Sequence, residues 1–543
     1  MTERRDKIRY LALGMALALL ACAAVLLTCG IRYETNDDAT LANIAAGAYG
    51  DDTLHMIYVN VLFALLLRPL YALAPAVNWY VIVQLALVVA ALGCLFAVFL
   101  KNSGIKNGLL FSLAVLVPFS VTLFYSFQYV KCCAVLLAVG LVLIADDLGS
   151  GKGQTVAGIL FVWLGSLIRW ENFCAVGALS ACMLLYRFFR LDAQHKKRAV
   201  ITVLVLFCAV LGGKACDAAA YANGEWAEYR QYNKARMELS DFKIYFVDQE
   251  ADDPLAGAGV SDIEYEMLEG WDFWDADRFP AERIRQIADS IRPPSFAQGA
   301  KDTVKAVFDL LHGESWRYVF WLVVAVGLLL LRPGAEWLAF AGTLTVGGGL
   351  LFYLQWRARF PTRVEVTLLF GAVAIGAYLI TKGQMRLRNR TAVYATVLVV
   401  ACLLSVHSVK EGIASGAAHR ERMHEEDIYF EQMSADAEHL YLLSTTAIQV
   451  AAGEDVWHPR PKDFYHNIVA YGGWMTNTPS RRQALAAYGI GDVFTDTVNN
   501  PTVYFDYHNI DRTAAYSSVH TGKNVCAVSV GDNAFASYQL VTE

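Results

Sequence analysis

The chain has 543 residues, of which 56% are hydrophobic and only 18% are charged. A water-soluble protein of this length carries more charge and shorter apolar runs, so the composition excludes an ordinary soluble domain. The net charge is −6, and no dense run of lysine and arginine occurs, which excludes a nucleic-acid-binding protein.

Apolar runs close to the ~20 residues that a helix needs to cross a bilayer recur along the first 410 positions. Each run must be helical, because backbone polar groups find no water in hydrocarbon. The membrane-spanning helices that we predict are eleven: 10–30, 78–100, 108–126, 129–146, 155–169, 172–187, 199–216, 315–331, 335–354, 364–381 and 391–408. The predicted fold class is therefore an all-α polytopic membrane protein.

Positive charges orient these helices, because lysine and arginine concentrate in cytoplasmic loops. The N-terminus and the segments 101–106, 187–198 and 382–390 carry such charges, and they fall on one side only if eleven helices cross. This orientation places the N-terminus in the cytoplasm and the C-terminus outside the cell membrane.

One apolar stretch, residues 56–75, remains outside this set, and Arg68 and Pro69 inside it argue against a lipid-facing span. We predict that it lies at the outer face as an interfacial or re-entrant hairpin. The alternative is an ordinary span followed by loops with an unusual charge distribution.

Three external regions follow from this topology: loops at about 31–77 and 217–313, and a terminal region, 411–543. The membrane domain then covers residues 1–410. In the terminal region, strand-like and helical pieces alternate, for example 439–444 and 480–488, which predicts a small extracytoplasmic α/β domain.

Carboxylates gather in the first external loop. Asp37 and Asp38 follow the first helix directly, and Asp51 and Asp52 lie further on in a glycine-flanked turn. Partly desolvated carboxylates beside a bilayer act as general bases or hold a divalent metal ion. The alternative for Asp37, or for Asn36 before it, is a helix N-cap. For Asp51 and Asp52, simple solvation is the alternative.

Several basic residues face outward in this topology, against the usual bias: Arg32, Arg68, Lys131, Arg169, Arg357, Arg359 and Arg363. Arginine suits phosphate oxygens and keeps its charge near a low dielectric, so their convergence indicates an anion site. The alternatives are ion pairs of Arg169 with Glu171 and of Arg363 with Glu365, or contacts with lipid headgroups.

The second external loop carries aromatic and polar residues at helical spacing: Tyr221, Trp226, Tyr229, Tyr232, Asn233 and Arg236. Such a stripe is typical of packing against a neighbour, and stacking on a sugar is the alternative.

This layout resembles the GT-C superfamily of membrane glycosyltransferases, such as protein O-mannosyltransferases and aminoarabinose transferases. NDDATLANIAAG is similar to their acidic pair after the first helix, and GSLIRWEN and RFPTRV are similar to their basic outer turns. The chain has Asp38 where many relatives have glutamate, lacks their His-Pro-Pro, and offers only His55 as a loose counterpart.

The resemblance implies sugar transfer from a polyprenyl-phosphate donor at the outer face. Asp37 is implied as the general base, with Asp38 orienting it or a divalent metal ion. Arg169, Arg359, Arg363 and Lys131 are implied to bind the donor phosphate, with an unspecified protein, lipid or glycan as acceptor. A transporter or flippase of lipid-linked sugars and a non-catalytic membrane protein stay open as other classes.

Overall fold

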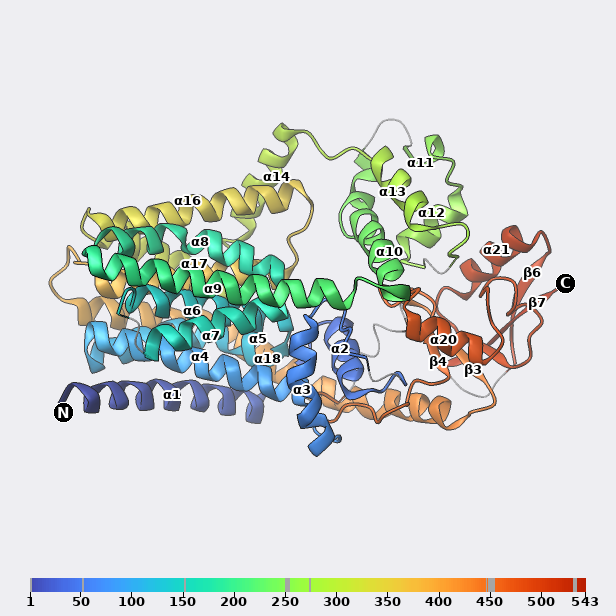
Figure 1. The fold of residues 1–543 in the computed structure, drawn as a ribbon, viewed down its shortest axis with the longest axis horizontal. Coiled ribbons are helices and arrows are strands. Elements are labelled where there is room, and N and C mark those ends of the chain that lie inside the picture. The colour runs from blue at the N-terminus through green and yellow to red at the C-terminus, as the bar shows by residue number, and fades with distance from the viewer. Residues whose placement is uncertain are drawn as a thin grey trace.

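The structure, a computed structural model, describes residues 2–50, 53–150, 153–249, 254–272, 275–445, 447, 455–530 and 535–543. A bundle of long helices fills one half of the molecule, and the external regions gather at one end of it (Figure 1). The bundle helices are α1 (Thr2–Thr28), α4 (Trp79–Ser103), α5 (Ile105–Phe124), α6 (Tyr129–Asp146), α7 (Gly153–Ile168), α8 (Trp170–Phe189), α9 (Ala193–Ala220), α15 with its π-helical extension (Ser315–Leu330), α16 (Ala335–Trp356), α17 (Thr362–Lys382) and α18 (Arg390–Ala435).

These helices correspond one to one with the predicted spans, which confirms the polytopic helical fold class. Within the described residues, nine helices are long and apolar enough to cross a membrane, while α7 and α15 are shorter. Helix α6 is buried along its whole length, and α17 is almost as deeply buried. Both helices therefore form the centre of the bundle. Helices such as α9 expose leucine, valine and phenylalanine, as lipid-facing helices do.

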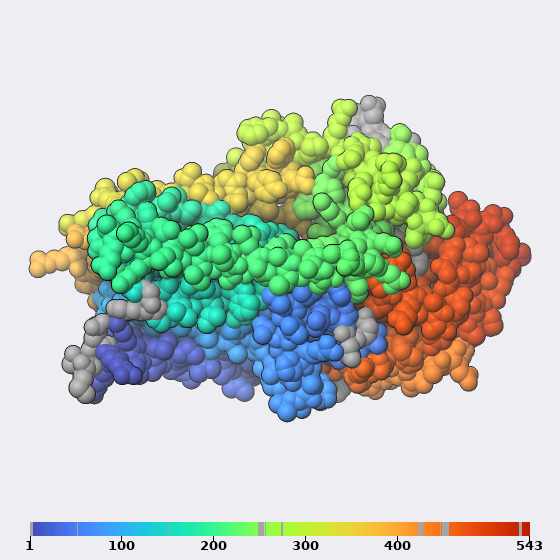
Figure 2. All heavy atoms as spheres, viewed as in Figure 1, coloured from blue at the N-terminus to red at the C-terminus, as the bar shows by residue number. Residues whose placement is uncertain are grey.

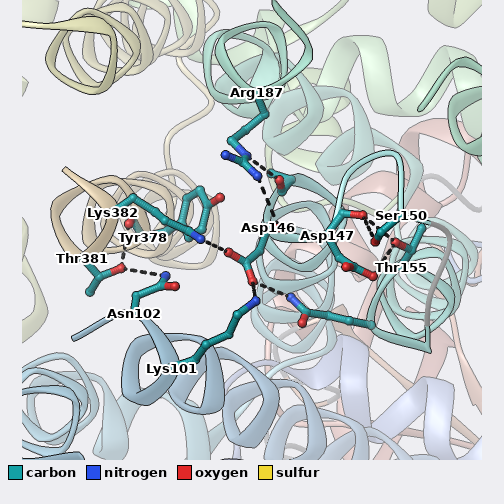
Figure 3. A network of polar contacts seen from close by, with 12 residues as sticks. Lys101, Asn102, Asp146, Asp147, Ser150, Thr155, Arg187, Tyr378, Thr381 and Lys382 are labelled. Carbon is teal, nitrogen blue, oxygen red and sulfur yellow. Dashed lines mark hydrogen bonds and ion pairs between the residues drawn. The ribbon is translucent and has the colours of Figure 1, made fainter. Parts of the chain in front are cut away.

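Polar contacts fasten the bundle together at the end predicted to be cytoplasmic (Figure 3). The carboxylate of Asp146, at the end of α6, lies 2.7 Å from the Nζ atoms of both Lys101 and Lys382, and Gln154 donates to it over 2.9 Å. Arg187 donates to a backbone carbonyl in the last turn of α6. We call these five residues the inner cluster; they connect α4, α7, α8 and α17 to α6.

The apolar stretch 56–75 contains helix α3 (Val61–Leu73), which stands across the end of the bundle predicted to face outward, rather than along it (Figure 1). Its 13 residues are too few to cross a bilayer. Phe63 and Leu67 are buried, whereas Leu66, Arg68 and Leu73 are exposed. One buried face and one exposed apolar face agree with the predicted interfacial position.

The external elements form the other end of the molecule. They are α2 (Asn36–Ala46), α10 (Gly224–Ser240), η1 (Lys243–Gln249), α11 (Pro254–Gly257), α12 (Asp262–Glu269), α13 (Ala281–Ser290) and α14 (Phe296–Asp309). The short strands β1 (Arg32–Tyr33) and β2 (Ser126–Phe127) pair in parallel and tie the start of the first loop to the turn before α6.

The C-terminal region is built on a five-stranded sheet with the order β4-β3-β5-β7-β6. Its elements are β3 (Leu440–Leu443), β4 (Ile468–Ala470), α20 (Pro479–Ala487), β5 (Val503–Asp506), α21 (Ile510–Thr521), β6 (Val525–Ser529) and β7 (Ala536–Thr542). Strands β4, β3 and β5 run parallel, and β7 is antiparallel to β5 and β6. The small α/β region is therefore confirmed.

Two features of this region differ from a simple separate domain. Helix α18 continues without a break through position 410 to Ala435. The sheet also shares one hydrophobic core with the second external loop, where Leu239, Met267 and Ile284 pack in the same cluster as Leu442 and Phe505. The second loop and the C-terminal region therefore fold as one unit at the outer end, where the first loop also contacts them (Figure 2).

Candidate active site

Helix α2 presents the two carboxylates of the first loop. Thr35 is its extended N-cap residue, and Gly47 ends the helix with a φ of 80°, a left-handed conformation that suits glycine. Asp37 and Asp38 lie in the first turn, where the positive end of the helix dipole favours carboxylates. Neither Asn36 nor Asp37 is the N-cap, so that alternative is wrong.

Asp38 turns into the bundle. Its side chain is fully buried, and Oδ1 accepts hydrogen bonds from the Tyr129 backbone N–H at 3.0 Å and the Tyr80 hydroxyl at 3.3 Å. Burial raises the pKa of the Asp38 carboxyl well above its usual range, although the Tyr129 N–H opposes the shift. Asp38 therefore anchors α2 to α4 and α6.

Asp37 contacts residues from distant parts of the chain. Its Oδ1 accepts a 2.8 Å hydrogen bond from the indole N–H of Trp474, which follows β4 in the C-terminal region. Its Oδ2 lies 4.0 Å from Nη2 of Arg363, in the first turn of α17. The Asp37 side chain remains 18% exposed, so this carboxylate is partly open to solvent.

The outward arginines reach this region by different routes. Arg363 is not paired with Glu365, because Glu365 binds Arg317 at 2.6 Å. Arg359, from the connection between α16 and α17, forms an ion pair of 3.4 Å with Asp241. Arg363 is thus the arginine closest to Asp37 among the predicted phosphate ligands.

Arg169 lies between α7 and α8 as the residue before the first turn of α8. It pairs with Glu171 at 2.8 Å, as the alternative interpretation proposed. It also donates to the Tyr129 hydroxyl at 3.4 Å, and its guanidinium lies 5.2 Å from the centre of the Tyr58 ring. Tyr58 in turn meets the Trp474 ring edge-on at 5.0 Å, so Arg169 and Asp37 are linked through two aromatic side chains.

A cavity of about 650 Å³ opens beside Arg169 and Tyr58, between residues 57–60 of the first loop, the end of α7, and helices α8, α9 and α10. Its charged lining residues are Arg169, Lys214, Arg230 and Lys234 against Glu171, Asp217 and Glu238. Each of these acids lies within ion-pair distance of an arginine. Lys214 and Lys234 have no such carboxylate partner in the described parts of the chain, which leaves the cavity with surplus positive charge. Asp37 and Arg363 do not line it.

Lys131 does not join this group. Its ammonium is 2% exposed, forms an ion pair with Glu34, and donates to the hydroxyl and carbonyl of Thr122 at 2.9 and 3.1 Å. These partners use its donors, so the ammonium faces the β1–β2 junction and not an anion pocket.

The remaining predicted residues of the first loop lie elsewhere. His55 stacks on Trp226 with ring centres 4.2 Å apart and bonds the backbone carbonyl of Ala220, so it belongs to the contact with the second loop. Asp51 and Asp52 lie outside the described residues.

The two adjacent carboxylates do not suit a metal ion. Asp38 already accepts hydrogen bonds, and burial favours its neutral form, which is a poor ligand. Across the residues that the structure describes, no group of three or more histidine, cysteine, aspartate or glutamate side chains is arranged to hold one.

The sequence did not point to three residues of this site: Tyr58, Lys214 and Trp474. The stripe on α10 was predicted to pack, and Tyr229, Tyr232 and Arg236 are indeed buried. The spacing of Arg236 within that stripe indicated that it is buried. A buried arginine needs polar partners, which is a sign of a functional or structural role.

Comparison with solved structures finds a similarity to a crystal structure of ArnT from Cupriavidus metallidurans in the apo state, over 98% of both chains, with 12% identity and a TM-score of 0.40. No family model and no curated protein matches the chain. Because the identity and the TM-score are low, a functional assignment rests on the residues of this chain alone.

Proposed function

We propose that this membrane protein is a glycosyltransferase that moves a sugar from a polyprenyl-phosphate donor to an acceptor hydroxyl on the outer face of the membrane. The observation that carries the proposal is the setting of Asp37. One of its oxygens is held by the Trp474 N–H, and the other faces Arg363 from 4.0 Å while the side chain stays accessible.

In this reaction Asp37 removes the proton from the acceptor hydroxyl. The acceptor oxygen attacks the anomeric carbon, and the bond from that carbon to the phosphate oxygen breaks. The polyprenyl phosphate leaves with the bonding electron pair, and Asp37 keeps the proton until solvent takes it. A single displacement inverts the configuration at the anomeric carbon.

Cations stabilise the negative charge that develops on the departing phosphate. Arg169, together with the surplus charge of the cavity at Lys214 and Lys234, supplies this on one side, and Arg363 supplies it beside Asp37. The rings of Tyr58 and Trp474 lie between these two groups and offer aromatic surface to the apolar face of a sugar.

Two features support a lipid-linked donor. The cavity borders α9, whose exposed side chains include Phe207 and Leu211, so a headgroup in the bilayer can enter from the side. A second cavity of about 310 Å³ lies among α15, α16 and α17, is lined almost entirely by apolar side chains, and includes Phe360 between Arg359 and Arg363. It suits an isoprenoid chain.

The test is reconstitution of the purified protein in liposomes with a panel of polyprenyl-phosphate sugars, followed by mass analysis of donor and products. We expect Asp37→Asn to lower transfer by about 10³-fold, because a general base contributes 10²–10⁴-fold. Asp309→Asn, an exposed carboxylate on α14, is the matched control and should transfer as the unmodified protein does.

Transfer by Asp37→Asn at the unmodified rate would show that Asp37 is not the base and would remove the basis of the proposal. Donor that changes leaflet without losing its sugar would instead assign the protein to the flippase class.

A further inference from the structure

The side chain of Arg236 on α10 is fully buried near the candidate site, with 0% exposure. Its Nη2 donates to the Tyr58 hydroxyl at 3.1 Å and its Nε to Asn233 at 3.0 Å. The third nitrogen, Nη1, has no hydrogen-bond partner in the described residues and lies 3.8 Å from Asp241. Burying a guanidinium costs desolvation free energy unless hydrogen bonds and ion pairs offset it.

The contacts of Arg236 join three separate segments. Tyr58 belongs to the first loop, and Asp241 pairs with Arg359 from the turn before α17. Below the guanidinium, at 5.3 Å, lies the ring of Trp271, whose carbonyl accepts from the Gly473 N–H in the C-terminal region. Arg236 thus lies where all the external pieces of the site meet.

The same helix also holds Trp474. The Tyr229 hydroxyl, two turns before Arg236 on α10, donates to the Trp474 carbonyl at 2.7 Å. Trp474 then donates its indole N–H to Asp37. Helix α10 therefore fixes both aromatic residues that lie between Asp37 and the cavity.

Backbone strain is concentrated around these residues. Among the described non-glycine residues with positive φ, four are Asn or Asp, which tolerate that conformation. The other three are Ile57 (φ 65°), next to Tyr58; Trp271 (φ 65°), under Arg236; and Ala358 (φ 47°), next to Arg359. Such conformations persist only where surrounding contacts enforce them.

We infer that Arg236 is a positioning residue of the transferase site. It holds Tyr58 in place and, together with Tyr229, holds Trp474 in place. The sugar then meets Asp37 in a reactive orientation. The inference rests on the proposed function for its kinetic consequence, but its structural consequence is independent of any substrate. Misplacing a reacting group by about 1 Å costs on the order of 10²-fold in rate.

The first experiment needs no substrate. Hydrogen exchange is measured on peptides that cover residues 53–63 and 471–478 in the unmodified protein, in Arg236→Met and in Arg285→Met, an exposed arginine on α13 that serves as control. We expect Arg236→Met alone to speed exchange in both peptides by about tenfold, equivalent to about 1.4 kcal/mol of local opening, with the bundle helices unchanged.

The second experiment follows transfer from a polyprenyl-phosphate sugar. Arg236→Met should lower kcat by 10-fold to 100-fold, on the order of a misplaced catalytic geometry, with the donor KM within about twofold. Arg236→Lys should recover part of kcat, because one ammonium can reach Tyr58 but cannot hold Tyr58 and Asn233 together.

If Arg236→Met fails to fold, Tyr58→Phe removes the same hydrogen bond and keeps the ring, and it must show the same local change. Unchanged exchange in both peptides would overturn the inference, as would uniformly faster exchange along the whole chain. Absence of transfer by the unmodified protein would refute the proposed function and leave the exchange result to decide the role of Arg236.

Discussion

The two ends of the bundle each place a carboxylate among basic residues, yet the two arrangements differ. At the inner cluster, Asp146 is fully buried and contacts Lys101, Lys382 and Gln154 within 2.9 Å. At the outer end, Asp37 has one hydrogen bond and one arginine at 4.0 Å, and it keeps an exposed edge. A buried carboxylate with three close polar contacts can hold helices together, whereas one with an exposed oxygen can take a proton from a ligand.

The largest effect should follow from removing charge at the inner cluster. Asp146→Asn leaves two lysines without their carboxylate, and we expect the free energy of unfolding to fall by about 2–3 kcal/mol, below the full cost of a broken buried pair because Lys101 is 39% exposed. Asp37→Asn should change it by less than ~0.5 kcal/mol. Thermal unfolding in detergent checks both.

Sugar transfer completes this test. Asp146→Asn should keep transfer per folded molecule, and Asp37→Asn should lose it. Equal loss of stability in the two variants would mean that Asp37 is also a structural carboxylate.

A smaller effect is expected at the hydrogen bond that distinguishes Asp37. Trp474→Phe keeps an aromatic ring beside Tyr58 but removes the N–H donor to Oδ1. We expect transfer to fall about tenfold, equivalent to about 1.4 kcal/mol, the scale of a hydrogen bond to a charged group. Trp457→Phe, a partly exposed tryptophan whose indole lies away from Asp37 in the described contacts, is the control. Equal rates in the two variants would separate Trp474 from the chemistry.

The smallest effect is expected at Asp38. Burial raises the pKa of the Asp38 carboxyl, so its contribution to stability is complete below its ordinary pKa of about 3.9 and is lost as the pH rises through the raised value. Asparagine has the shape of the neutral acid and does not ionise. Asp38→Asn should therefore unfold at the same temperature near pH 4 and at an equal or higher temperature at pH 8.

Transfer by Asp38→Asn should stay within about twofold of the unmodified rate, since Asp38 contacts α4 and α6 and not the exposed site. A loss as large as that of Asp37→Asn would give Asp38 a direct part in the reaction.

Much of the fold could be predicted because a bilayer imposes length, composition and charge bias on each helix. Arg68, Pro69 and the count of positively charged loops predict that α3 does not cross the membrane. Asp37 and Arg363 stand out as site candidates because a charge beside a membrane is costly unless it has a function. These are local rules, and a single sequence expresses them.

The partners of each charge could not be predicted, because packing between distant segments decides them. Trp474 is 437 positions from Asp37, and no sequence pattern near either residue predicts the hydrogen bond between them. From the sequence, Lys131 and Arg169 are equally good candidates to bind a phosphate. In the structure, Glu34 pairs with Lys131, whereas Arg169 lines a cavity. His55 likewise stacks on Trp226 instead of facing the carboxylates.

Helix α18 sets the distance between the bundle and the C-terminal sheet. Its 46 residues form one continuous rod of about 70 Å, at 1.5 Å per residue, that leaves the bundle and ends just before the C-terminal sheet. A flexible linker would let the sheet move relative to the bundle, whereas a continuous helix fixes the distance between them. The sheet is therefore held at a fixed distance from the bundle, which keeps Trp474 beside Asp37.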